Sequence, residues 1–364
     1  MKNIPGFTIV DRYIIRKFLT TFFFALILFI VIAIVFDITE KLDDFIDGHV
    51  PFTEIVFIYY LSFIPFFAVT FTPLFLFVSV IFFTSRMAAN SEIVAILNGG
   101  MTFRRFLVPF FIAATIIMLL NIYANHWVVP QANKTRVGFE NTYINTSWSV
   151  DKSNIHMQVE KGLYMYLQNY NYSDSTGYRF AIEKFTGDNL VYKLKSDRVI
   201  WNYPTKKWKI INYTERRNGR MSESLHNGKD TLVAYNFSPK DFARKVDEAT
   251  TLDAKELNDV IADERLKGSQ NVPSFEVEKY RRTAFPFAIL ILTLIAVALS
   301  SRKTRGGTGM HIGLGIALSF SYILFMQFSS TFSINGNLPA YIAVWIPNIL
   351  YLFIALVLLR LAPK

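Results

Sequence analysis

Few residues of this chain have the types and spacing that catalysis or metal binding would need. The histidines are scattered, and none belongs to an H-x-x-x-H or H-E-x-x-H arrangement. The absence of Cys removes thiolate ligands for zinc, and no G-x-S-x-G nucleophile elbow occurs. We therefore predict no catalytic residues, no metal site and no cofactor, so the chain is not expected to be an enzyme.

The Gly-rich basic segment 303–309 is the closest approach to a phosphate-binding loop. It lacks the G-x-x-x-x-G-K-[ST] order in which backbone amides and a Lys bind phosphates. A flexible turn is the simpler interpretation. No ATP site is therefore predicted, and ATP-driven work would need a separate ATPase subunit.

Segment 85–105 predicts a short amphipathic helix between two apolar stretches. Asn90 or Ser91 can cap its start, and Glu92 in the first turn suits the positive end of the helix dipole. A Gly-Gly pair at 99–100 would end it. Its apolar residues fall at i, i+3 and i+4 on one face: Ile93, Ile96 and Leu97. By pattern alone, this face could lie on a lipid surface or enter a groove of a soluble partner.

Lys134 and Arg136 are the basic residues with the clearest link to an anionic ligand. They follow an apolar stretch and Trp127, a residue type that favours membrane interfaces. They would stand at headgroup depth, where cations can meet phosphates. Routine anchoring at the membrane surface is the alternative interpretation.

Gly309, Gly313 and Ala317 place small residues four apart on one apolar stretch. Small residues on one helix face let another helix approach closely. This face is a candidate helix-packing or subunit interface, although the same spacing also arises by chance.

The elements that must position these residues are largely apolar. Of 364 residues, 52% are hydrophobic and 18% are charged, which argues against a purely soluble multidomain protein and against a disordered chain. Six stretches are apolar over the roughly 20 residues that a spanning helix needs: 18–36, 55–84, 106–125, 283–301, 312–333 and 338–359. The sequence predicts a polytopic α-helical membrane protein with six transmembrane helices.

The net charge of +10 follows the positive-inside pattern. In both terminal tails and in the loops 85–105 and 302–311, every charged residue except Asp11 and Glu92 is basic, whereas 37–54 is strongly acidic. We expect both termini to be cytoplasmic and the long segment after the third helix to lie outside. Because the charge is explained by membrane orientation, no nucleic acid partner is expected.

The insertion between the third and fourth apolar stretches is typical of a folded all-β domain. From 133 to about 240, apolar and polar residues alternate, aromatic residues are dense, and Gly, Asn and Asp are frequent. Residues 199–201 and 208–213 form the clearest predicted hairpin, joined by a Pro-containing loop. A helix is predicted at about 252–267, ended by Gly268.

At these motifs the chain resembles the LptF/LptG (YjgP/YjgQ) family, the permease subunits of the bacterial lipopolysaccharide export transporter. The matching stretches are Asp11–Ile14, Ser91–Gly100, Trp127–Gln131 and Leu252 through Tyr280–Phe287. Their order around a β insertion covers essentially the whole chain. The Asp-Arg-Tyr-Ile start is slightly more similar to LptG than to LptF.

The resemblance implies a fold of six transmembrane helices with an inserted periplasmic β-jellyroll-like domain. Residues 1–130 would hold helices 1–3 and a cytoplasmic coupling helix at about 86–100. Residues 131–282 would form the periplasmic domain with its connecting helix, and 283–364 would hold helices 4–6. The expected location is the bacterial inner membrane, as a multi-pass protein.

The resemblance also implies partners: a second permease of the same family, a cytoplasmic ATPase dimer, a periplasmic bridge protein, lipopolysaccharide and membrane lipids. Together they would extract lipopolysaccharide from the inner membrane and pass it to the bridge. The coupling residues would be Arg86, Ser91, Glu92, Ile93, Ile96 and Leu97, with the apolar face in the ATPase groove.

Lys134 and Arg136 match residues that contact lipid A phosphates in this family. The LptG side also has a Lys near the outer end of the first helix. No Lys aligns there in this chain, and acidic residues surround Lys41 nearby. This phosphate contact is therefore expected to be weaker or differently arranged.

Two other classes of function remain open from the sequence. A membrane-anchored scaffold could recruit periplasmic partners without transport, and a polar cavity at a subunit interface would argue against it. Uncharged polar residues in the spans could line such a cavity or make isolated packing hydrogen bonds: Ser62, Thr70, Thr72, Ser79, Asn121, Gln327 and Asn348. A lipid-modifying enzyme is disfavoured because the spans lack an acid, base or nucleophile cluster.

Overall fold

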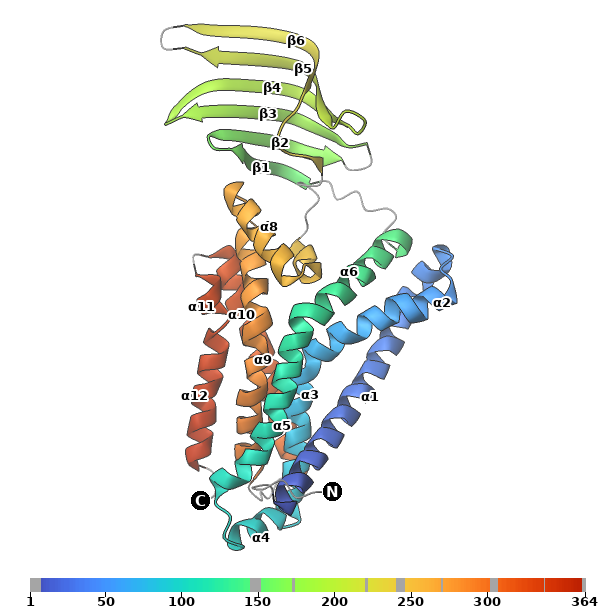
Figure 1. Ribbon diagram of the computed structural model, residues 1–364, viewed down its shortest axis with the longest axis vertical. Helices are drawn as coiled ribbons and strands as arrows, with labels where there is room; N and C mark the ends of the chain where they lie inside the picture. The colour runs from blue at the N-terminus through green and yellow to red at the C-terminus, as the bar shows by residue number, and fades with distance from the viewer. Residues whose placement is uncertain are drawn as a thin grey trace. The chain divides into compact units, whose positions relative to one another are not determined.

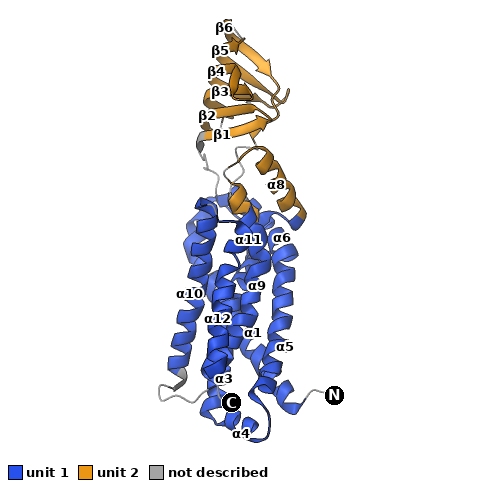
Figure 2. Ribbon diagram, turned by 90° about the vertical axis from the view of Figure 1, so that its left-hand side faces the viewer, with its two compact units in different colours: residues 1–144, 250–254, 276–364 blue, residues 145–249, 255–275 orange. Residues whose placement is uncertain are grey.

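The computed structural model describes residues 8–144, 152–171, 174–219, 222–239, 246–269, 271–301, 307–336 and 338–361. The chain divides into two compact units (Figure 2). Unit 1 comprises Met1–Ile144, Thr250–Ala254 and Glu276–Lys364, and unit 2 comprises Asn145–Ala249 and Lys255–Phe275. Each unit has its own hydrophobic core.

Unit 1 is a helical bundle, and the described residues contain six helices long and apolar enough to cross a membrane. In chain order these are α1 (Ile9–Asp47), α2–η1–α3 (Phe52–Glu54, Ile55–Tyr60, Leu61–Ala89), α5–η2–α6–η3 (Phe103–Tyr123, Ala124–Val128, Val129–Phe139, Glu140–Ile144), α9 (Val272–Ser300), α10 (Gly307–Asn335) and α11–α12 (Ala340–Ala343, Ile346–Leu361). A short helix, α4 (Glu92–Asn98), joins the second span to the third. The prediction of a polytopic helical membrane protein is confirmed.

The described ends of the chain, Thr8 and Leu361, lie at the same end of unit 1 as α4 (Figure 1). We call this the terminal end of unit 1. The chain leaves for unit 2 after η3 and returns through the start of α9, both at the opposite end (Figure 1). We call that the insertion end.

Several helices extend beyond the apolar stretches that predicted them. Residues 37–47 continue α1, although their charge suggested a loop, because Glu, Lys and Leu are good helix formers even where hydropathy ends. The third span continues as α6 past the boundary expected after residue 130. Pro130 sits in the first turn of α6, a position where a missing N–H can be tolerated. The division between units accordingly falls after Ile144.

Helix α3 contains two prolines, Pro65 and Pro73, and remains one continuous helix. Pro73 has no N–H to donate to the carbonyl of Val69, one turn earlier. The side chain of Asn121 on α5, which is 4% exposed, donates Nδ2–H to this carbonyl at 3.1 Å. A neighbouring helix thus satisfies the acceptor that proline frees, which is how such helices persist away from water.

The six spans differ in how much of their surface the chain itself covers. In the most apolar window of α9, 67% of residues are buried, compared with 28% for α10 and 17% for α1. Helix α9 therefore occupies the centre of the core. The apolar surfaces of α1 and α10 face outward, available to lipid or to another helix.

Unit 2 contains an open antiparallel sheet in which the strands follow chain order, β1 to β6 (Figure 1). The strands are β1 (Lys152–Glu160), β2 (Leu163–Asn171), β3 (Thr176–Thr186), β4 (Asn189–Asn202), β5 (Lys207–Asn218) and β6 (Glu223–Val233). Alternate residues of β2 to β5 are buried on one face, as period-two patterning requires. The sheet is open rather than closed, consistent with a jellyroll-like domain.

The predicted hairpin is confirmed in detail. Strands β4 and β5 pair from Asn202 with Lys207 and Trp201 with Trp208 onward. Trp208 is 1% exposed, and its Nε1–H donates to the carbonyl of Phe237 at 2.9 Å. This satisfied indole anchors the apolar face of the sheet, and a satisfied N–H is what a buried Trp requires.

The predicted helix at 252–267 is also confirmed, as α8 (Ala254–Leu266). It ends at Gly268, whose φ of +63° is the left-handed conformation that favours glycine after a helix. Lys267 accepts a backbone hydrogen bond from Gln158 of β1 at 2.9 Å, which ties the helix end to the sheet.

Candidate functional site

Helix α4 is the structural counterpart of the predicted amphipathic helix. It runs from Glu92 to Asn98, and Ser91 precedes it with a φ of +59° and without a side-chain cap. Asn90 instead donates Nδ2–H to Glu92 at 3.2 Å. Arg86 is exposed in the last turn of α3, outside the helix. The helix is thus shorter than the 86–100 segment.

The predicted apolar face of α4 packs against the chain itself. Ile93 is 1% exposed and belongs to the core of unit 1, and Ile96 and Leu97 pack against that core. The surface left for a partner is the other face, where Val94 is 56% exposed and Ala95 is also exposed. This differs from the expectation that the 93, 96, 97 face enters a partner groove, because the flanking spans bury that face first.

A capping box and two contacts with other helices fix α1 at the terminal end. Thr8 and Asp11 form a capping box, in which the Thr8 N–H donates to the Asp11 carboxylate at 2.7 Å. The same carboxylate accepts two bonds from Arg105 of α5, at 2.6 and 2.5 Å. Tyr13 donates its O–H to Glu92 at 3.2 Å, which joins α1 to α4. A movement of α4 would therefore reach α1 as well as α3 and α5.

The two predicted basic residues, Lys134 and Arg136, point to different faces of one helix. Both residues lie on α6, where positions i and i+2 point to different faces of a helix. Lys134 is exposed. The guanidinium of Arg136 lies 4.9 Å from the ring centroid of Phe66 on α3, and its buried Nε has no hydrogen-bond partner among the described residues. Arg136 faces the interior of the bundle, and Lys134 does not.

Lys41 is held in a charged cluster at the insertion end of α1. Its Nζ donates to Glu140 of η3 at 2.9 Å and to the Tyr59 hydroxyl, and it lies 3.6 Å from Asp37. Tyr60 donates to Asp37 at 3.0 Å. We call these five residues the Lys41 cluster. Since two carboxylates already pair with one ammonium, Lys41 is poorly placed to recruit a phosphate.

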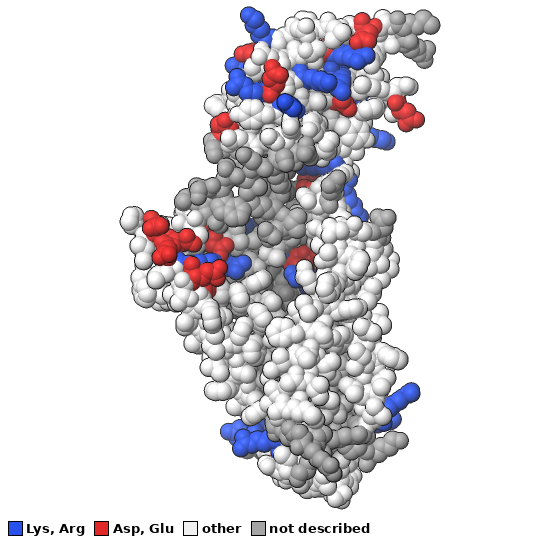
Figure 3. Space-filling view, turned by 180° about the vertical axis from the view of Figure 1, so that it is seen from behind, with Lys and Arg blue, Asp and Glu red and all other residues white. Residues whose placement is uncertain are grey.

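The acidic character of this end extends beyond the cluster. Figure 3 shows red carboxylates gathered around α1 at the insertion end of unit 1, with blue side chains at the terminal end. Exposed Glu40, Asp43, Asp44 and Asp47 belong to this patch. The surface potential of unit 1 therefore changes sign from one end to the other.

The small-residue face on α10 is turned outward. Gly309, Gly313 and Ala317 are exposed, and a Cβ added at either glycine would meet nothing within 4 Å. The glycine that α10 uses for packing in this chain is Gly315, where an added Cβ would come within 2.3 Å of Ile81 on α3. The predicted face remains a candidate for contact with another chain.

A triad of charges at the start of α9 was not singled out from the sequence. Glu278 accepts from Arg281 at 2.6 Å and from Arg282 at 3.0 Å. Arg282 is 3% exposed and also donates to the carbonyl of Leu252 at 2.8 Å. The signal was present, because Glu278 stands three and four residues before these arginines, the helical spacing for side-chain pairs.

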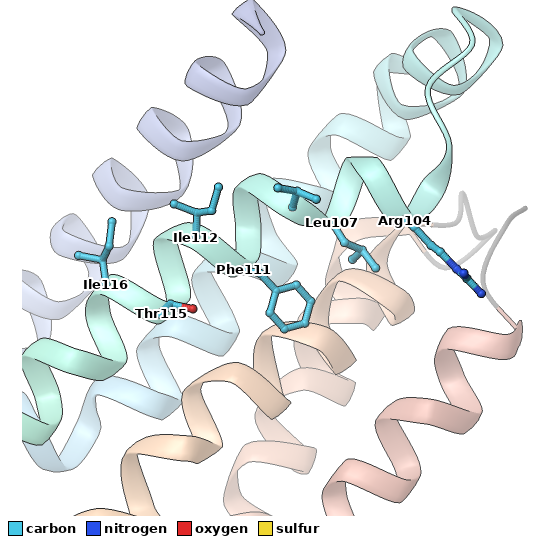
Figure 4. Close-up of a pocket in the computed structure, with 7 residues that line it drawn as sticks. Arg104, Leu107, Phe111, Ile112, Thr115 and Ile116 are labelled. Atoms are coloured by element: carbon cyan, nitrogen blue, oxygen red, sulfur yellow. The ribbon is translucent and has the colours of Figure 1, made fainter. Parts of the chain in front are cut away.

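The surface hollow along α5 differs from the sites above because one helix supplies its whole lining. Figure 4 shows Leu107, Phe111, Ile112, Thr115 and Ile116 projecting from α5, with Arg104 at the terminal end. Within the part of the chain that the structure describes, no second element lines this hollow. This arrangement is typical of a lipid-facing helix with an interfacial Arg.

No group of three or more His, Asp or Glu side chains within the described ranges could hold a metal ion. Asp11 pairs with Arg105, and Glu278 pairs with the two arginines of α9. The sites described above are surfaces for contacts with lipid and protein, and they lie at both ends of the helical bundle.

Comparison with protein families gives a match across nearly the whole chain. Residues 12–361 match the family model described as "Lipopolysaccharide export system permease LptF/LptG". A comparison with curated proteins gives no match. The matched range includes all six spans and the inserted sheet, so the architecture and the match agree. The chain belongs to the LptF/LptG family of lipopolysaccharide export permeases.

Proposed function

We propose that this protein is one permease subunit of an ABC transporter that extracts lipopolysaccharide from the inner membrane. A second permease of the family would complete the transmembrane part, and a cytoplasmic ATPase dimer would supply the energy. The terminal end, with its basic charge, would face the cytoplasm, and unit 2 would lie in the periplasm.

The observation that carries the proposal is the attachment of α4. Its inner face is part of the bundle core through Ile93, and Glu92 bonds to Tyr13 of α1. A force applied to the exposed face at Val94 would therefore move several spans together. Such rigid-body coupling is how a soluble motor can change the spacing of membrane helices.

The outward surfaces support a second permease as partner. The small-residue face of α10 and the apolar length of α1 are left uncovered by the chain itself. Between two such permeases, these surfaces would enclose the acyl chains of the substrate. Once the lipid leaves the membrane, the apolar face of the sheet would shield it on the way to a periplasmic bridge protein.

The test is reconstitution of the purified protein with its partner permease and ATPase in vesicles containing lipopolysaccharide. We expect ATP-dependent release of lipopolysaccharide to a bridge protein. Val94→Asp should abolish this release, whether the complex still assembles fully or is weakened. Ala95→Ser, which keeps the same exposed face small and neutral, is the matched control. ATP-independent binding of partners with no release would favour the scaffold alternative.

A further inference from the structure

A cavity of about 270 Å³ lies within unit 1 near the insertion end, lined by residues of α3, η2, α6, α9 and α10 and by Thr250. Six of its lining residues decide its chemistry: Phe66, Arg281, Phe285, Ile323, Gln327 and Ser330. Its volume lies just below the range of roughly 300–1,000 Å³ for small-ligand pockets. The cavity can therefore hold part of one lipid, and it is too small for a lipid with many acyl chains.

On α9 and α10, the polar residues that line this cavity lie nearer the insertion end than the apolar residues Phe285 and Ile323. Helix α9 enters the bundle from the insertion end, so Arg281 comes before Phe285 along the direction of depth. Helix α10 runs the other way, so Ile323 lies deep while Gln327 and Ser330 lie near the insertion end. A polar mouth above an apolar floor matches a ligand with a charged head and an apolar tail.

Among the described residues that line it, the mouth carries one excess positive charge. Glu278 is the single carboxylate that Arg281 and Arg282 share. Arg282 is buried and bonded to both Glu278 and Leu252, whereas the side chain of Arg281 is 42% exposed. Arg281 uses Nε and Nη2 for Glu278. Its remaining guanidinium edge can meet an anion, and guanidinium binds carboxylate and phosphate oxygens well.

Ser330 provides an independent indication of a ligand. It is 6% exposed and lines the cavity, and its Oγ has no hydrogen-bond partner among the described residues. The hydroxyls of Ser329 and Ser333 on the same helix do have partners, the carbonyls of Ala343 and Leu338. A buried hydroxyl without a partner calls for an explanation, and a ligand oxygen in the cavity would supply one.

We propose that this cavity binds a singly charged anionic amphiphile, through a carboxylate or a phosphodiester at Arg281 and Ser330 and one acyl chain against Phe285 and Ile323. The two sources of this chemistry are a free fatty acid and a glycerophospholipid such as phosphatidylglycerol. All the described residues that line the site belong to this one chain, so binding there can be measured without a second permease. The proposal therefore does not depend on which lipid is exported.

The experiment is native mass spectrometry of the full-length, delipidated chain in detergent, titrated separately with phosphatidylglycerol, palmitate, phosphatidylcholine and lipopolysaccharide. We expect one molecule of phosphatidylglycerol or palmitate to bind at least about tenfold more tightly than phosphatidylcholine, the range of one charge-assisted contact. Tighter binding of phosphatidylglycerol than of palmitate would identify a phospholipid as the natural ligand, and the reverse would identify a fatty acid.

Three variants place the binding in this cavity. Arg281→Gln should remove the preference for the anion. Ser330→Ala should weaken binding by about threefold, which corresponds to the loss of one weak hydrogen bond. Gln327→Trp should block the mouth of the cavity. Phe328→Trp is the matched control, since Phe328 is the next residue on α10, is 60% exposed and does not line the cavity.

Circular dichroism of each variant separates lost binding from lost folding, and Ser330→Ala keeps every charge in place. Equal affinity for phosphatidylcholine and phosphatidylglycerol would overturn the proposal. So would binding of lipopolysaccharide alone, or anion preference that survives Arg281→Gln.

Discussion

The two ends of α1 are both fastened by charged residues, yet they are built differently. At the terminal end, one carboxylate, Asp11, caps the helix and pairs with one guanidinium, Arg105. At the insertion end, Lys41 stands between Asp37 and Glu140 and is supported by two tyrosines. The first contact is balanced in charge, whereas the second carries an excess negative charge.

The difference shows where α1 depends on a single residue. Removal of Lys41 would leave two carboxylates facing each other, while removal of Asp11 would leave one exposed cation and a weaker cap. Between these ends, the helix is mostly uncovered. Its position is therefore set at its ends rather than along its length, as suits a helix that must later contact a lipid or a partner.

The largest effect on stability is expected at the terminal end, where α4 meets the bundle. Ile93→Asp would bury a charge in the core without a cation, and we expect it to cost about 4 kcal/mol. Val94→Asp, the adjacent exposed position, should cost less than about 0.5 kcal/mol. Thermal unfolding in detergent compares the two. Similar losses for both variants would show that α4 does not pack by the face described.

Lys41→Met sharpens the comparison at the insertion end. Breaking a fully buried ion pair costs about 3–5 kcal/mol, and because Lys41 is 21% exposed we expect about 2 kcal/mol. Chemical denaturation measures this loss. The double variant Lys41→Met with Glu140→Gln should recover part of it, since only Asp37 then lacks a cation. If Lys41→Met were as stable as the unmodified protein, the Lys41 cluster would not stabilise α1.

Asp11→Ala should have a smaller effect, about 1 kcal/mol, the usual value of a helix cap. Thr8→Ala is its matched control, because it removes the cap hydroxyl and retains the pair with Arg105. The difference between the two variants in thermal unfolding reports the ion pair together with the bond from the Thr8 N–H to Asp11, because only Asp11→Ala removes both. A larger loss for Thr8→Ala than for Asp11→Ala would contradict the assignment.

The smallest effect on the isolated chain is expected at Gly313. An added side chain there meets no atom, so Gly313→Leu should change stability by less than about 0.5 kcal/mol. Gly315→Leu, two residues on, should destabilise strongly because Ile81 lies in the way. Co-purification of Gly313→Leu with the partner permease then tests whether Gly313 contributes to association of the two permeases. Normal assembly of Gly313→Leu would remove this face from the proposed interface.

The sequence predicted the spans and the sheet because each has a strong internal period. Hydropathy located all six helices, and alternation with a turn located the turn of the β4–β5 hairpin to within one residue on each side. The helix ends were missed where charged residues continue a helix, as in 37–47 of α1. Helix propensity, rather than hydropathy, determines where such helices end. The propensities of these residue types differ too little for the sequence to locate the end.

The candidate sites were less predictable because they depend on contacts between distant residues. Lys41 meets Glu140, and Asp11 meets Arg105, across about a hundred positions that no local pattern connects. The apolar face of α4 was found correctly, but the sequence could not show whether the chain or a partner covers it. Lys134 and Arg136 seemed paired by their spacing along the chain, and helical geometry separates them.

The bond from Asn121 to the carbonyl of Val69 has a consequence for how the protein enters the membrane. While α3 is alone in the bilayer, Pro73 leaves that carbonyl without a donor, at a cost that lipid cannot relieve. The donor arrives only with α5, the next span to be synthesised. The second and third spans are thus expected to become stable in the bilayer as a pair. Insertion of the second span would be completed only when Asn121 supplies the missing donor.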